Sequence, residues 1–149
     1  MNKLKLSLLV TALIVSSGAF AHSDEYLDIQ VAPHGGQLRM VGNYHYELVV
    51  AKNSNSVQQN AVIVYVTDHA GNKIATKGAT GSVTILSGKL KSTALLQADG
   101  DNGLKGSAKY ASTPDMKAVV MITFAGQKPE QARFTPLAVA KDGHGGHMH

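Results

Sequence analysis

The chain has no cysteine and no tryptophan, and aromatic residues make up only 5% of it. Without thiols it can form no disulfide, carry no lipid-anchored cysteine and offer no thiolate to a metal. The shortage of aromatic side chains argues against a flat stacking platform for polysaccharide. Stability must therefore come from an apolar core, and a transition-metal site must use imidazole, carboxylate, thioether or the amino terminus.

Residues 1–21 have the pattern of a secretory signal peptide. Two lysines come first, residues 6–15 are almost wholly apolar, and residues 19–21 read Ala-Phe-Ala. The apolar run is shorter than the roughly 20 residues that span a membrane, although an uncleaved anchor is the alternative. We expect cleavage after Ala21, export to the periplasm and a mature chain that begins at His22 without a membrane span.

The excess of positive charge is small. The chain has 14 Lys and Arg against 10 Asp and Glu, which gives a net charge of +4. Loss of Lys3 and Lys5 with the leader lowers this charge to +2. So weak and scattered an excess argues against a nucleic-acid partner.

Most of the chain has the residue pattern of short β-strands. Runs rich in β-branched residues are separated by turn signals about every 8 to 12 residues, and no window after the leader shows a sustained helical period. This pattern predicts an all-β fold, a single antiparallel β-sandwich of immunoglobulin-like type over residues 22–137. A flexible, histidine-rich tail is expected over residues 138–149. Strands are expected at residues 26–31, within 37–50, and at 61–67, 82–86, 91–96, 104–108, 116–124 and 131–135.

The side-chain pattern of the hairpin within residues 37–50 predicts its strand register. A two-residue loop at Gly42-Asn43 would mix apolar and polar side chains on one face, whereas a three-residue loop pairs Met40 with Tyr46. The three-residue loop is therefore the predicted one. It places one set of side chains inward, namely Leu38, Met40, Tyr46, Leu48 and Val50, and another outward, namely Arg39, His45 and Glu47.

Both ends of the mature chain offer metal ligands. The tail carries His144, His147 and His149 among glycines, and short histidine-rich tracts commonly bind metal. His22 would offer an α-amine and an imidazole on one residue, which is a good chelate for Cu(II). The alternatives are a solvated tail and a frayed amino terminus.

Three further histidines lie within the expected domain. His34 precedes a double glycine, where backbone can approach a neighbour closely. His45 shares a side of its strand with Glu47, and a carboxylate can orient an imidazole. His69 follows Asp68 in a turn. Each could instead be an ordinary surface histidine beside a surface acid.

Patterns of catalytic residues are missing. There is no G-x-S-x-G, no H-E-x-x-H, no cysteine nucleophile and no phosphate-binding glycine loop before a helix. The loop at residues 99–103 lacks the closing glutamate of a calcium loop. We therefore expect that the protein is not an enzyme, with a small copper oxidase using His22 as a remote alternative.

Six segments of the expected domain carry a family resemblance: residues 33–37, 44–49, 64–71, 118–124, 126–129 and 132–134. Together they resemble small exported bacterial proteins associated with heavy-metal efflux and resistance. They are also similar to β-rich modules of periplasmic adaptor subunits of metal efflux pumps. The resemblance implies a periplasmic metal-handling role, a possible efflux-pump partner, and His34, His45 and His69 as matching candidates. The His22 start is separately similar to periplasmic copper carriers of β-sandwich fold, although their methionine-rich segment is absent.

The sequence therefore favours a periplasmic protein that buffers, carries or helps export a divalent transition metal ion, namely copper, zinc, nickel or cobalt. The second hypothesis is a metal-independent interaction module of an envelope complex, whose mark would be an exposed apolar patch. The candidate metal ligands are His22, His34, His45, Glu47, His69, His144, His147 and His149.

Overall fold

A computed structural model describes residues 23–139 as one short helix followed by eight antiparallel strands in a single sheet. The predicted all-β antiparallel fold is confirmed. The strand order across the sheet is β1-β2-β3-β6-β5-β4-β7-β8. The elements are α1 (Asp24–Asp28), β1 (Gln37–Val41), β2 (Tyr44–Val50), β3 (Gln58–Asp68), β4 (Thr80–Ser87), β5 (Leu90–Asp99), β6 (Gly103–Tyr110), β7 (Lys117–Thr123) and β8 (Glu130–Phe134).

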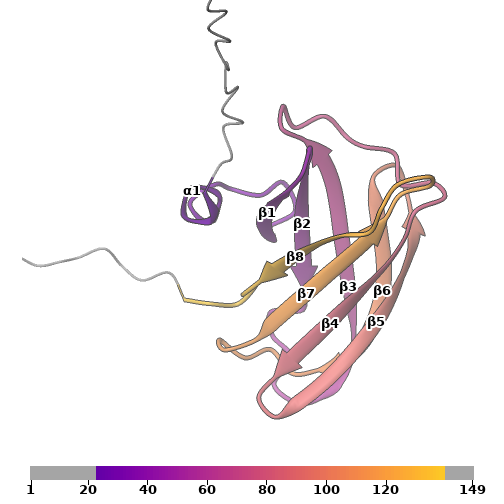
Figure 1. Cartoon of the computed structure of the whole chain (residues 1–149). Helices are drawn as coiled ribbons and strands as arrows, with labels where there is room; N and C mark the ends of the chain where they lie inside the picture. The colour runs from indigo at the N-terminus through magenta and orange to yellow at the C-terminus, as the bar shows by residue number, and fades with distance from the viewer. Residues whose placement is uncertain (1–22, 140–149) are drawn as a thin grey trace, which may run out of the picture.

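The sheet bends so that its two halves face each other. In Figure 1, β1, β2 and β3 lie behind, while β8, β7, β4 and β5 cross in front. The halves join at β5 and β6, which pair only near their shared turn, from Gln97 with Lys105 to Asp99 with Gly103. The arrangement resembles a sandwich made from one continuous sheet.

The core lies between the two halves and follows from strand alternation. Alternate residues in the middle of β3 and β4 are fully buried, namely Val62, Val64, Val83 and Ile85. Burying one such side chain stabilises the fold by about 1.5–3 kcal/mol. No helix in residues 23–139 is long and apolar enough to cross a bilayer.

The predicted strand at residues 26–31 is wrong, because helix α1 occupies its first half. Ser23 caps the helix: its hydroxyl accepts a hydrogen bond from the Tyr26 amide at 3.3 Å. Asp24 and Glu25 in the first turn complement the positive end of the helix dipole. Local capping therefore outweighs the alternation of apolar residues.

The predicted register of the first hairpin is also wrong. The loop has two residues, so Val41 pairs with Tyr44 and Met40 with His45. Leu38 and Met40 therefore lie on the outward side with His45, and Arg39 turns inward beside Tyr46. Arg39 is only 7% exposed. Its burial is compensated by partners that the sequence pattern does not show.

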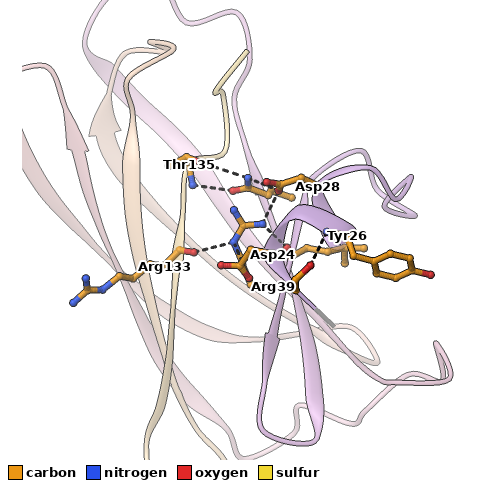
Figure 2. A network of polar contacts seen from close by, with 9 residues as sticks. Asp24, Tyr26, Asp28, Arg39, Arg133 and Thr135 are labelled. Carbon is orange, nitrogen blue, oxygen red and sulfur yellow. Dashed lines mark hydrogen bonds and ion pairs between the residues drawn. The ribbon is translucent and has the colours of Figure 1, made fainter. Parts of the chain in front are cut away.

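Those partners lie at the seam between the two edge strands, β1 and β8. Arg39 donates from Nη1 to Asp28 Oδ1 at 2.6 Å and from Nε to the Arg133 carbonyl at 3.2 Å (Figure 2). Asp24 forms a longer ion pair with Arg39 Nε at 3.6 Å, and the guanidinium lies 5.9 Å from the centre of the Phe134 ring. One side chain thus ties α1, β1 and β8 together.

Gln37, two residues before Arg39 on β1, makes a similar bridge. Its Oε1 accepts a hydrogen bond from the Thr135 amide at 2.8 Å, and its Nε2 donates to Asp28 Oδ1 at 3.0 Å. In the described part of the chain, side chains rather than a backbone ladder close the seam.

Candidate functional site

All three histidines within residues 23–139 gather on the outward side of β2 and β3. His45 belongs to β2, His34 comes from the segment before β1, and His69 comes from the turn after β3. We call the small cavity beside them, of about 130 Å³, the histidine pocket. It is lined by Pro33, His34, Leu38, His45, Glu47, Tyr65, Thr67 and Gly71, and His69 stacks on His45 at its margin.

The segment at residues 33–36 reaches the pocket because glycine allows a close approach. A Cβ at Gly36 would clash with the Leu48 carbonyl oxygen and lie 2.9 Å from Glu47 Cγ. Gly35 adopts a φ of 71°, which other residues resist. Lys52 holds the bend by donating to the Gly35 carbonyl at 2.8 Å. The double glycine therefore folds His34 back over β2.

Glu47 is the anchor of this arrangement, with only 3% of its surface exposed. Its Oε1 lies 2.9 Å from His34 Nδ1, and its Oε2 accepts hydrogen bonds from the amides of His34 and Gly36, both at 2.9 Å. A carboxylate can only accept, so Nδ1 carries the proton. In the neutral ring, the lone pair then lies on Nε2, which is the atom that can bind a metal.

The His34 ring is also fixed from one face. It stacks on Tyr65 with ring centres 3.6 Å apart and planes 9° apart. Tyr65 pairs with Glu47 across the ladder between β2 and β3. Neighbouring residues on two strands thus hold both the edge and the face of one imidazole.

The other two imidazoles form a stacked pair. The ring centres of His45 and His69 lie 4.9 Å apart, with planes inclined by 25°. An ion binds in the plane of an imidazole ring, at a nitrogen about 2.0–2.1 Å away. Two stacked rings would therefore have to rotate about their side-chain bonds before both could share one ion.

Asp68 organises the turn that presents His69. Its Oδ1 accepts hydrogen bonds from the amides of Ala70 and Asn72 at 2.9 and 2.8 Å, and its Oδ2 accepts from the Asn72 side chain at 3.0 Å. The side-chain hydrogen bond from Asn72 is the main reason that the pKa of Asp68 lies below its ordinary value, followed by the backbone hydrogen bond from Asn72. The carboxylate is thus kept charged and the turn kept closed.

In residues 23–139, no group of three or more His, Asp or Glu side chains is already arranged as the ligands of one ion. The structure does bring together four of the candidate residues: His34, His45, Glu47 and His69. The other four candidates, His22, His144, His147 and His149, lie outside the described residues, as does the expected signal peptide.

Two contributors to the site were not expected from the sequence. Tyr65 and Thr67 lie in the apolar run of β3, but their alternation with Val64 and Val66 places them outward. Their positions opposite Glu47 and His45 were the available signal. Comparison with protein families, curated proteins and solved structures finds no match for this chain.

Proposed function

We propose that the protein binds a divalent transition metal ion at the histidine pocket. The observation that carries the proposal is the grouping of all three histidines in residues 23–139: His34 and His45 line one pocket, and His69 stacks on His45. Two of the three imidazoles already stack, and the third is held by a buried carboxylate. This arrangement fits imidazole ligation better than it fits unrelated surface histidines.

The three histidines are assigned as ligands and Glu47 as the residue that orients one of them. Both Glu47 oxygens already accept hydrogen bonds, so the carboxylate acts on the ion through His34. An all-imidazole site without thiolate suits copper, zinc, nickel or cobalt. His45 and His69 complete the site by rotating out of their stack.

The role proposed is that of a non-catalytic buffer, carrier or efflux accessory in the periplasm. The signal-peptide pattern of residues 1–21 supports export, and the resemblance to efflux-associated proteins supports metal handling. His22 and the tail histidines would then offer a second place of capture, distinct from the pocket.

Calorimetric titration tests the pocket separately from the two chain ends. The protein is prepared with His22→Gln, His144→Ala, His147→Ala and His149→Ala, then titrated with Zn(II), Cu(II), Ni(II) and Co(II). We expect binding of one ion per chain for at least one metal. Affinity should fall as the pH drops through about 6.5, because the ligand imidazoles must be neutral.

Adding His45→Ala and His69→Ala to this protein should weaken metal binding at least about a hundredfold. Loss of a residue that only hydrogen-bonds to a metal ligand typically costs less. Thr93→Ala, on the outward side of β5, is the matched control and should change nothing. The proposal would be falsified if the four-substitution protein bound none of the metals, or if the two histidine substitutions left its affinity intact.

A second candidate function, a metal-independent interaction module, is favoured by a different observation. Large apolar side chains on β4, β5 and β7 remain exposed on the outward side of the sheet. The charges around them indicate what such a surface would bind.

A further inference from the structure

The outward side of β4, β5, β7 and β8 carries apolar side chains on neighbouring strands. Leu95 is 77% exposed, Leu86 44% and Met121 41%. Leu95 and Met121 flank Ser82, one on each side, in the ladders that β4 forms with β5 and β7. These side chains share one side of the sheet, and Val119, which pairs with Thr84 between Ser82 and Leu86, continues the apolar surface from Met121 toward Leu86.

Cations border this surface at one end. Leu86 lies between Lys91 and Lys117, and Val119 lies beside Arg133. We call these seven residues the open face: Leu86, Lys91, Leu95, Lys117, Val119, Met121 and Arg133. In residues 23–139, none of its three cations has an ion-pair partner.

A hollow of about 480 Å³ opens at the cationic end of the open face. Leu86, Val119 and Phe134 supply apolar lining, and Lys117 and Arg133 supply positive charge. Asp24 also lines the hollow, but it is engaged with Arg39. The Arg133 side chain extends away from the Arg39 network, as Figure 2 shows. The hollow therefore combines apolar contact with two available cations.

We infer that the open face docks an acidic, partly apolar segment of a partner protein. Carboxylates of the segment bind Lys117 and Arg133 at the hollow, while its apolar side chains cover Leu86, Met121 and Leu95. Charge complementarity selects the partner: the open face itself contains no acid, and Asp24, the one acid that lines the hollow, is paired with Arg39.

A protein fits the open face better than a lipid surface does. Each cation near an anionic membrane contributes only about 1 kcal/mol, and the open face has three. It also lacks the Trp and Tyr residues that anchor proteins at the membrane interface. The inference is independent of metal binding, because the open face and the histidine pocket share no residue.

Photo-crosslinking in the native cells tests the inference. A benzophenone amino acid replaces Leu95 in the full-length protein, and the adduct formed on irradiation is identified by mass spectrometry. We expect an adduct with one protein, attached at a segment that contains Asp or Glu. Lys117→Glu with Arg133→Glu should lower the yield at least about fivefold, because rim charges govern encounter and orientation.

Lys73→Glu with Lys109→Glu is the matched control, since both lysines are exposed and pair with residues of β3, on the other half of the sheet. This control should leave the yield unchanged, and urea unfolding should show that both charge-reversed proteins remain folded. A synthetic peptide of the crosslinked segment should bind the purified protein. Changing the acids of the peptide to Lys should restore its binding to the Lys117→Glu, Arg133→Glu protein.

Several outcomes would overturn the inference. They are the absence of an adduct, an adduct with lipid or with a second copy of this chain, a crosslinked segment without carboxylates, and a yield that charge reversal does not lower. Binding of the purified protein to vesicles of phosphatidylglycerol and phosphatidylethanolamine in place of the peptide would also contradict it.

Discussion

The outward sides of the two halves of the sheet differ in what covers them. Over β1, β2 and β3, the segment at residues 33–36 and the turn at residues 68–72 fold back and bring His34 and His69 to His45. Over the open face, residues 23–139 provide no such covering segment, and it carries Lys, Arg and apolar side chains instead. The strands of the two halves are built alike, so the connecting segments decide which half gains a site for chemistry.

Outside the apolar core, the largest effect on stability is expected at the seam between β1 and β8. Arg39→Ala removes the hydrogen bonds to Asp28 and the Arg133 carbonyl, together with packing against Phe134. We expect a loss of about 2–3 kcal/mol in the free energy of unfolding, measured in urea. Arg39→Lys, which keeps one charge but not the planar fork, should lose less. An unchanged Arg39→Ala midpoint would show that the seam is closed by other contacts.

Glu47→Gln should affect metal binding at the histidine pocket but not binding at the open face. An amide cannot accept at both of its terminal atoms, so one set of hydrogen bonds to His34 and Gly36 is lost. We expect metal affinity to fall about 10- to 100-fold, while crosslinking from position 95 stays unchanged.

The nitrogen chemical shifts of His34 provide a readout that a purely structural role of Glu47 would not move. In the parent protein they should report a proton on Nδ1, and in Glu47→Gln they should report a mixture of tautomers. If the shifts did not respond to this change, Glu47 would not be what sets the tautomer.

Asp68→Ala should have a smaller effect, because it loosens only the turn that presents His69. We expect metal affinity to fall several-fold. The native fold lowers the pKa of Asp68, so the carboxylate stabilises the fold above its ordinary pKa, and this contribution is lost as the pH falls below about 4. The thermal unfolding midpoints of the parent protein and of Asp68→Ala should therefore differ at pH 7 and become equal in acid. A gap that widened in acid would contradict this sign.

The smallest effect is expected for Leu95→Thr on the open face. Leu95 is 77% exposed, so its replacement should change the free energy of unfolding by no more than about 0.5 kcal/mol and should leave metal affinity unchanged. Leu96→Ala, at the buried neighbouring position, should cost about 2–5 kcal/mol. A large loss of stability for Leu95→Thr would mean that the open face is covered within the chain itself.

Strong local patterns were enough to predict the all-β class and most of the strands. The β-branched run at residues 61–67 forms most of β3, and the strands expected at residues 82–86 and 91–96 form the hairpin of β4 and β5, in which Ser87 pairs with Leu90. The failures occurred where a distant contact or a local cap overrode alternation. Arg39 turns inward because β8 and α1 supply partners, and Ser23 starts a helix where apolar alternation suggested a strand.

The candidate site could be predicted only in part. Strand alternation placed His45 and Glu47 on one outward side, and this is confirmed despite the wrong hairpin register. That His34 would reach Glu47 depends on the close approach at Gly36, which no local pattern specifies. The stacking of His69 on His45 likewise depends on the turn that Asp68 holds.

The position of a bound ion would show whether the three histidines form one metal site. Crystals of the protein grown with Zn(II), or with the metal that binds most tightly in the titrations, would be measured at the absorption edge of that metal. We expect an anomalous peak in the histidine pocket, about 2.0–2.1 Å from the Nε2 atom of His34, with His45 and His69 turned toward it. A peak found only at the chain ends, with the histidine rings still stacked, would contradict it.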